Sequence, residues 1–189
     1  MPQKTKITKK EILSASLSIV RESGDAALNA RAIAKKLNCS TQPIFSNYST
    51  MEDVKADVML TAKQLYRQYL EDGMKDALYP PYKASGIAYI RFAKEERELF
   101  KLLFMRDRSR EEIKEEREEI SHLLQLIASS TGMSLEEAYS FHIGMWIYVH
   151  GIATMIATAY LDWDWERVSS MLTEAYQGMK ERYIKREDE

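Results

Sequence analysis

The chain has 189 residues, of which 45% are hydrophobic and 30% are charged, and its formal net charge is -2. This much apolar material can bury a core, which argues against a disordered or fibrous protein. With only 4 prolines and 7 glycines, and without period-two alternation, the sequence favours an all-α fold over a β-rich one.

The sequence also indicates where the protein resides. Its single cysteine, Cys39, cannot form an internal disulfide, which is typical of the reducing cytoplasm. Residues 1–10 are polar and basic and lack the apolar stretch of a secretory signal. The longest apolar run, residues 143–159, is interrupted by His150 and is too short to span a membrane. We therefore expect a cytoplasmic protein without a membrane partner.

Short capping patterns mark the starts of several predicted helices. Thr8 followed by Glu11 forms a capping box, in which each side chain bonds the backbone N–H of the other residue. An apolar stripe follows it and ends at Gly24, where a left-handed backbone costs little. The same Ser/Thr-x-x-Glu pattern recurs at residues 49–52, 109–112 and 134–137. Each of these predicts another helix start.

Two short apolar-periodic segments, residues 30–37 and 42–48, are separated by residues 38–41. This break is too short for anything but a tight turn, so the layout predicts a helix-turn-helix. Asn29 is placed to cap the first segment, and Pro43 is tolerated in the first turn of the second.

Charge is distributed unevenly along the chain. Residues 1–50 contain eight Lys and Arg against three Asp and Glu, a net charge of +5, which leaves -7 for the rest. Phosphate contacts supply much of the non-specific affinity for DNA, so a basic head on an acidic body is typical of a DNA-binding module joined to a non-binding one. The alternative is an ordinary fluctuation of surface charge.

We therefore predict a three-helix DNA-binding domain over residues 1–50 and a larger helical domain over residues 51–189. About nine helices are expected in all. Those of the larger domain cover residues 51–73, 84–94, 98–105, 109–131, 134–161 and 165–183, with Asp164 capping the last. The acidic run at residues 111–119 is most simply a solvated helix face.

The last two predicted helices carry wide apolar stripes and are joined by a short turn. Two such neighbouring antiparallel helices suggest half of a four-helix bundle. We infer a symmetric homodimer formed through residues 134–185. The alternative is that both stripes belong to the core of one subunit, and periodicity alone does not separate the two.

Two sets of spaced residues carry a family resemblance. The first set is Asn29, Arg31, Ile33, Ala34, Cys39, Ser40, Pro43, Ile44, Phe45, Asn47, Tyr48, Thr50, Met51 and Val54. The second is Tyr89, Phe92, Ala93, Leu99, Phe100, Leu103, Phe104, Trp146, His150 and Gly151. At these offsets the chain resembles the TetR/AcrR-type transcriptional regulators, and the second set resembles the subgroup with a Trp/His-Gly signature in its C-terminal domain.

The resemblance implies an all-α homodimer with DNA-binding N-terminal helices, a connecting fourth helix and a ligand cavity among the middle helices. It also implies a ligand-responsive repressor that binds a palindromic operator in double-stranded DNA. The chain departs from the family at Phe45, where Tyr is common, at Asn47, where His is common, and at Met51, where Lys is usual. Losing the phenol and the lysine should weaken contact with DNA phosphates.

If the second helix of the motif enters the major groove, the side chains at its N-terminus face base edges. Thr41 and Gln42 are the candidates to read bases, since Gln can bond adenine and Thr can meet a thymine methyl. The other residues expected to contact DNA, mainly through its backbone or by charge, are Asn29, Arg31, Ser40, Asn47, Tyr48, Lys4 and Lys6. Phe45 is expected to pack beneath the motif.

A cluster of aromatic and methionine residues is the candidate site for a small hydrophobic effector. Its members are Tyr89, Phe92, Phe100, Phe104, Met105, Trp146 and His150. His150 is the candidate polar anchor. The alternative is a filled core in which His150 is a satisfied core histidine.

Other classes of function have less support. His122, His142 and His150 lack the i, i+4 spacing with carboxylates that a helical metal site would use, so neither a metal nor a cofactor is expected. No nucleophile elbow, dinucleotide-binding motif or P-loop is present, so an enzyme is not expected. The alternative to a regulator is a helical protein-interaction adaptor without sequence-specific DNA binding.

Overall fold

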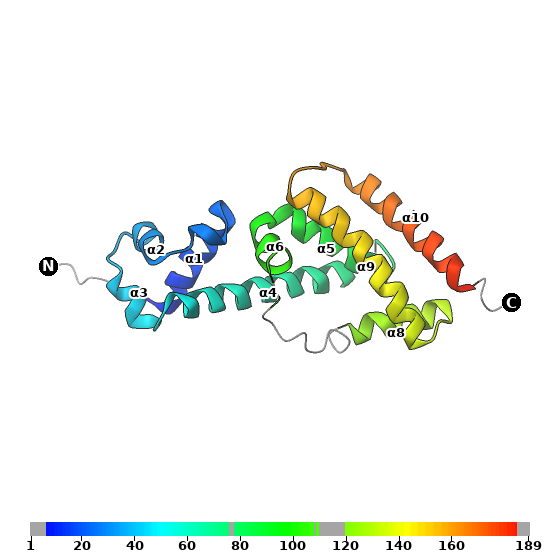
Figure 1. Ribbon diagram of the computed structural model, residues 1–189, viewed down its shortest axis with the longest axis horizontal. Coiled ribbons are helices and arrows are strands. Elements are labelled where there is room, and N and C mark those ends of the chain that lie inside the picture. The colour runs from blue at the N-terminus through cyan, green and yellow to red at the C-terminus, as the bar shows by residue number, and fades with distance from the viewer. Residues whose placement is uncertain (1–6, 76–77, 108, 110–119, 185–189) are drawn as a thin grey trace. The chain divides into compact units, whose positions relative to one another are not determined.

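The computed structural model describes residues 7–75, 78–107, 109 and 120–184 (Figure 1). Within these residues the regular structure is entirely helical and comprises nine α-helices and one short 3-10 turn, which confirms the all-α prediction. The elements are α1 (Lys9–Ser23), η1 (Asp25–Ala27), α2 (Ala30–Lys36), α3 (Gln42–Asn47), α4 (Met51–Lys75), α5 (Pro81–Glu95), α6 (Arg97–Phe104), α8 (Ser121–Thr131), α9 (Leu135–Ala157) and α10 (Trp165–Ile184). None of the described helices is long and apolar enough to cross a membrane.

The chain forms two compact units. The first unit runs to Tyr66 and includes Glu96–Arg106, and the second contains Arg67–Glu95 and the chain from Asp107 onward. The border therefore falls inside α4, and α6 belongs to the same unit as α1, α2 and α3. The predicted functional division at residue 50 remains a prediction.

Local hydrogen bonds explain where most helices begin and end. The boxes at Thr8 and Ser134 are both present, with the N–H of Ser134 donating to Glu137 Oε2 at 2.9 Å and the N–H of Thr8 to Glu11 Oε2 at 2.8 Å. Gly24 ends α1 with a φ of 77°, a region that favours glycine. The predicted box at residues 109–112 and the acidic run that follows it lie outside the described residues, apart from Ser109.

The box predicted for Ser49 and Glu52 is wrong by one residue. The N–H of Thr50 donates to Asp53 Oδ2 at 2.8 Å, and the N–H of Asp53 donates to Thr50 Oγ1 at 3.2 Å. Both residue pairs have the spacing of a capping box, and Asp53 takes the part that the pattern gives to a glutamate, so the spacing alone does not choose between them. In the structure the extended backbone of Tyr48 ends α3 and leaves Ser49 in the connecting turn.

Two predicted helix ends also differ from the structure. α4 continues through Gly73, where it was expected to fade, and ends at Lys75. A Cβ at position 73 would lie 2.6 Å from that of Ala88 on α5. The glycine therefore permits a close approach between α4 and α5 and does not mark a helix end. α9 ends at Ala157 and not at Leu161, and Ala159 in the turn that follows has a φ of 57°.

Each unit has its own buried core. Completely buried side chains of α1, α2, α3 and α4 form that of the first unit: Ile12, Val20, Ile33, Ile44 and Val54. In the second unit α5 and α9 pack closely against each other and against α8 and α10. One cluster there contains Ile127, Met133, Ala138, Phe141 and Met145, against which Tyr82, Tyr176, Met179 and Tyr183 pack.

Candidate functional site

The helix-turn-helix predicted from the sequence is formed by α2 and α3. Asn29 caps α2, because its Oδ1 accepts a hydrogen bond from the N–H of Ala32 at 3.0 Å. Its Nδ2 donates to the carbonyl oxygen of Ala27 at 3.1 Å. Asn38 opens the turn with a φ of 51°. The N–H of Asn38 donates to the carbonyl oxygen of Lys35 at 3.2 Å, and that of Cys39 to Ala34 at 2.9 Å, so local bonds hold the turn. Arg31 is exposed on α2.

The N-terminal end of α3 carries the residues predicted to read bases. Gln42 is the exposed first residue of this helix, Thr41 is its half-buried N-cap and Ser40 is exposed. Within the described part of the chain, no hydrogen bond holds any of these three side chains, and the hydroxyl of Thr41 does not cap the helix. Polar groups that are exposed and uncommitted in this way are available to an external partner.

Asn47 and Tyr48 are turned inward at the other end of α3. The Nδ2 of Asn47 donates to the carbonyl oxygens of Pro43 at 2.8 Å and Ile7 at 3.3 Å. Tyr48 is only 4% exposed, and its hydroxyl donates to Asp57 Oδ2 at 3.0 Å. Their described bonds hold the head together, so a contact of either with DNA stays a prediction.

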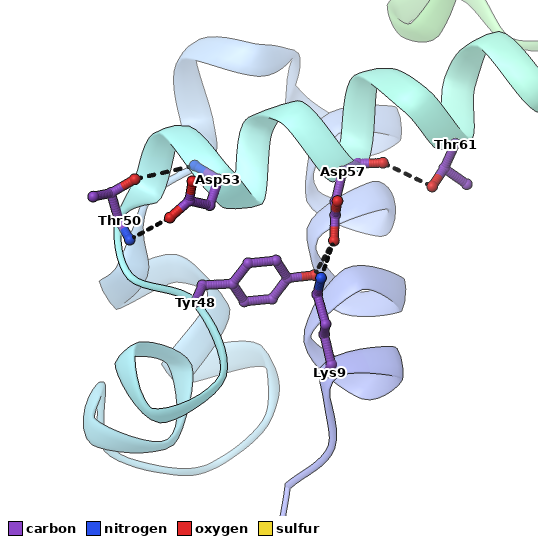
Figure 2. A network of polar contacts seen from close by, with 6 residues as sticks. All are labelled: Lys9, Tyr48, Thr50, Asp53, Asp57 and Thr61. Atoms are coloured by element: carbon purple, nitrogen blue, oxygen red, sulfur yellow. Dashed lines mark hydrogen bonds and ion pairs between the residues drawn. The ribbon is translucent and has the colours of Figure 1, made fainter.

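Lys9, Tyr48 and Asp57 form a network that sequence analysis did not identify (Figure 2). Lys9 Nζ lies 2.8 Å from Asp57 Oδ2 and 4.7 Å from the centroid of the Tyr48 ring. The hydrogen bonds from Lys9 and then Tyr48 lower the pKa of Asp57. Burial, followed by the bond to Asp57, raises the pKa of Tyr48. The Asp57 carboxylate, on α4, therefore joins this helix to α1 and to the end of α3 through two partners, Lys9 and Tyr48.

Phe45 does not pack beneath the motif, and that expectation is wrong. Its side chain is 49% exposed, whereas Ile44 beside it is fully buried. A helix as short as α3 has one inward face, and Ile44 and Tyr48, four residues apart, occupy it. Lys4 and Lys6, predicted to add charge near the DNA, lie outside the described residues.

The residues predicted to bind an effector are divided between the two units. Phe100, Phe104 and Met105 belong to the first, where the Phe104 ring packs on Phe100 and on Tyr66, with centroids 5.2 and 5.1 Å apart. Phe100 is fully buried and Met105 is 42% exposed. Phe100 and Phe104 therefore form part of the packing of the first unit, whereas Met105 is exposed.

Tyr89, Trp146 and His150 come together in the second unit. The Tyr89 hydroxyl and His150 Nδ1 are 2.8 Å apart, and the Trp146 ring stacks on the imidazole at a centroid distance of 5.1 Å. Thr154 Oγ1 lies 3.4 Å from His150 Nε2, and burial lowers the pKa of His150. Trp146 remains 42% exposed.

Phe92, the remaining predicted effector residue, is fully buried and packs edge-on against Tyr69 with centroids 5.3 Å apart. It is therefore a core residue of the second unit.

A second tyrosine–histidine pair was missed. The hydroxyl of Tyr82 is 3.0 Å from His142 Nδ1, and burial lowers the pKa of this histidine too. Tyr82 and Tyr89 are seven residues apart on α5, and the two histidines are eight apart on α9. Such spacings keep side chains on one helical face, so the sequence did contain a signal for this repeated contact.

Comparison with known proteins identifies the family. A family model described as "Tetracyclin repressor-like, C-terminal domain" matches residues 82–176, which is half of the chain. The chain belongs to the TetR family. The matched description does not distinguish the Trp/His-Gly subgroup, which remains a prediction. No curated protein matches the TetR-family chain at a significant level.

Solved structures show the same fold. A TetR-like transcriptional regulator from Rhodococcus sp. RHA1 is 13% identical, with a TM-score of 0.65 over 97% of this chain and 98% of that one. SCO1917, a TetR-family member from Streptomyces coelicolor A3, is 16% identical, with a TM-score of 0.59 over 88% and 96%. The multidrug binding protein EbrR, solved with imidazole, is 15% identical, with a TM-score of 0.57 over 88% and 93%. The protein therefore has the family and fold of a TetR-like transcriptional regulator.

Proposed function

We propose that this TetR-family protein is a cytoplasmic repressor that binds a palindromic operator as a homodimer and is released by a small hydrophobic effector. Family membership is the observation that carries this proposal. It is supported by the exposed, uncommitted side chains at the start of α3, on a head that the Lys9–Asp57–Tyr48 network holds together. In functional terms, residues 1–50 bind DNA and residues 51–189 bind the effector and the second subunit.

Gln42 and Thr41 read base edges in the major groove. Gln42 is exposed and has a free amide, so it can approach adenine without first breaking a bond inside the protein. Arg31, Ser40 and the N-terminal end of α2 at Asn29 contact phosphates, and Lys4 and Lys6 add charge from the N-terminal arm. Phe45 and Met51 supply no phosphate donor, so binding depends strongly on the arm and on the second head of the dimer.

Dimerisation involves residues 134–185, on α9 and α10. Large apolar side chains remain exposed on α9 in a single chain: Ile147 is 61% exposed and Met155 43%. Exposed groups of this size on one helix are typical of a subunit interface. A dimer places two heads on one duplex, which accounts for a palindromic operator.

The effector contacts the second unit near Trp146, Tyr89 and His150. The half-exposed indole offers an apolar surface, and the imidazole, bonded to Tyr89, offers a polar group beside it. The fold shared with the multidrug binding protein EbrR is compatible with a hydrophobic effector. Because α4 contributes to both units, an effector that shifts it changes the spacing of the two heads and lowers operator affinity.

Selection of bound duplexes from a random DNA pool by the full-length protein tests this function. A repressor of this kind enriches a palindrome whose half-sites lie about one helical turn apart, and its affinity falls steeply with salt. Enrichment of no sequence, together with salt-independent behaviour, would favour the helical adaptor instead.

A further inference from the structure

Phe45 is the large apolar side chain of α3 that the chain leaves uncovered. It is 49% exposed, whereas Ile44 beside it is fully buried. The next residue, Ser46, bonds back to its own helix, because its Oγ donates to the carbonyl oxygen of Gln42 at 2.9 Å. The outer surface of α3 therefore presents an aromatic ring together with the uncommitted amide of Gln42.

Phe45 and Gln42 lie on the same side of α3. They are three residues apart, which separates them by about 60° around the helix axis and about 5 Å along it. The inward side is occupied by Ile44 and by Tyr48, whose hydroxyl bonds Asp57 at 3.0 Å. The fold therefore presents the ring and the amide to one external surface.

The charge around this surface indicates the kind of partner that it fits. Residues 26–51, which include α2, the turn and α3, contain three basic residues and no aspartate or glutamate. Two of the three, Arg31 and Lys35, are exposed. An apolar ring within a basic surface fits a polyanion that also presents apolar groups, and the major groove of DNA has both properties. This step rests on the proposed function, operator binding.

We propose that Phe45 is a third base-reading residue, whose ring contacts the C5-methyl group of a thymine in the operator. The phenylalanine side chain has no hydrogen-bond donor or acceptor, so it cannot bond a phosphate or a polar base edge. The thymine methyl is the apolar group that the major groove presents. Removing one such group from water contributes about fourfold to affinity.

The spacing of Phe45 and Gln42 also locates this thymine. Their separation of about 5 Å along α3 is comparable to one or two base-pair steps of about 3.4 Å. With Gln42 on an adenine, the thymine that Phe45 contacts lies within about two base pairs of it. Each half-site of the operator should therefore contain two A·T pairs at neighbouring positions.

Replacement of single thymines by deoxyuridine tests the contact in the full-length protein. Deoxyuridine pairs with adenine as thymine does but lacks the C5-methyl group, so each thymine of the selected operator is replaced in turn. Fluorescence anisotropy at fixed salt measures the affinities. At one position within about two base pairs of the adenine, we expect the replacement to weaken the unmodified protein at least about threefold. The same replacement should leave the affinity of Phe45→Ala unchanged.

Thr41→Ser is the matched control, because it removes a methyl group from the other residue that can meet a thymine methyl. This variant should keep the response to deoxyuridine at the position that Phe45 contacts. Phe45→Leu retains an apolar side chain and should keep part of that response. Circular dichroism checks that Phe45→Ala is folded, which its exposed position leads us to expect.

Two results would overturn the role of Phe45 and leave operator binding intact. An identical response of Phe45→Ala and the unmodified protein to every deoxyuridine would show that the ring contacts no thymine methyl. An equal loss of affinity for operator and scrambled DNA in Phe45→Ala would place the ring against the sugar–phosphate backbone. Enrichment of no sequence by the unmodified protein would instead overturn the proposed function, and this contact with it.

Discussion

The two units of this protein use different kinds of polar contact. In the first unit, charged groups join the helices: Lys9 with Asp57, Lys36 with Glu22, and Arg21, whose guanidinium makes two hydrogen bonds to Glu96 at 2.8 and 2.7 Å. In the second unit, the half-buried contacts between α5 and its neighbours include uncharged pairs, Tyr82 with His142 and Tyr89 with His150. Charge-assisted bonds are directional and strong, which suits a head that must present α3 in one orientation.

The same difference separates the pH ranges in which the stability of each unit depends on pH. Hydrogen bonds from Lys9 and Tyr48 lower the pKa of Asp57, so the carboxylate of the first unit stays charged near neutrality. Burial lowers the pKa of His142 and His150, so the imidazoles of the second unit stay neutral there. Mild acid should therefore affect the second unit first. Five predictions test the comparison, beginning with the largest effect.

Phe141→Ala should destabilise the second unit by about 3–5 kcal/mol, because it leaves a cavity in a core where this ring contacts Tyr82, Tyr176 and Tyr183. Urea unfolding followed by circular dichroism measures the loss. Phe45→Ala, in the first unit, is the matched control and should change stability by less than about 0.5 kcal/mol, since that ring is half-exposed. Similar losses in the two variants would mean that Phe45 has a packing partner.

Gln42→Ala should reduce discrimination between operator and scrambled DNA by about 1–3 kcal/mol, because it removes the base contact proposed for the first unit. Arg31→Ala should instead weaken binding to both DNAs to a similar extent, as expected for a phosphate contact. Fluorescence anisotropy at fixed salt measures both affinities. Equal loss on the two DNAs in Gln42→Ala would refute the base-reading role.

Ile147→Glu should raise the dimer dissociation constant at least about tenfold, because it places a charge in the proposed interface of the second unit. Leu60→Glu is the matched control. Leu60 lies on α4 in the first unit, and its side chain is 54% exposed, compared with 61% for Ile147. This substitution should leave association unchanged. Sedimentation equilibrium measures both, and dissociation caused by Leu60→Glu alone would place the interface elsewhere.

Tyr48→Phe should destabilise the first unit by about 1–2 kcal/mol, because it removes a hydrogen bond to the charged Asp57 while keeping the ring. Lys9 should still hold the carboxylate, so the loss should be smaller than in Asp57→Ala. Tyr160→Phe is the control for removing a tyrosine hydroxyl, because the Tyr160 side chain is 79% exposed. Unfolding by urea measures all three variants, and no difference between the two tyrosine variants would show that the network contributes nothing.

The smallest expected effect is the pH dependence. Because burial lowers the pKa of His142 and His150 in the folded chain, the unfolded chain binds more protons as pH falls below 6.5. The stability contributed by the neutral imidazoles is thus present above pH 6.5 and lost below it. The contribution of Asp57 is lost only as pH falls below 3.8.

Urea unfolding at pH 7.5 and 5.5 measures this loss. The double variant His142→Gln with His150→Gln should reduce the difference in the free energy of unfolding between the two pH values. His122→Gln, at an exposed position, should leave that difference unchanged. An unchanged pH dependence of the free energy of unfolding in the double variant would show that other groups titrate between pH 5.5 and 7.5.

Much of the fold followed from the sequence because its signals are local. The caps at Thr8, Asn29 and Ser134, and the helix end at Gly24, all depend on bonds between residues three or four apart. The spacing of residues is enough to predict such contacts. The one-residue error at Ser49 arose where two overlapping pairs had the same spacing.

Less of the candidate site could be predicted, because its contacts join distant parts of the chain. Tyr82 and His142 are separated by 60 residues, and Tyr89 and His150 by 61. Periodicity placed Tyr89 and His150 on apolar helices, but it did not show which helices pair. The same limitation applies to Phe100 and Phe104, which were grouped with His150 although α6 belongs to the first unit.

By itself, therefore, the sequence determined most of the helices, the caps at Thr8, Asn29 and Ser134, and the helix-turn-helix, since each depends on short-range hydrogen bonding and the 3.6-residue period. Only the tertiary structure decided that Phe45 faces solvent and that Tyr48 is bonded to Asp57. Those outcomes depend on which faces of distant helices pack together. Packing is set by the fit of whole surfaces, which no local spacing encodes.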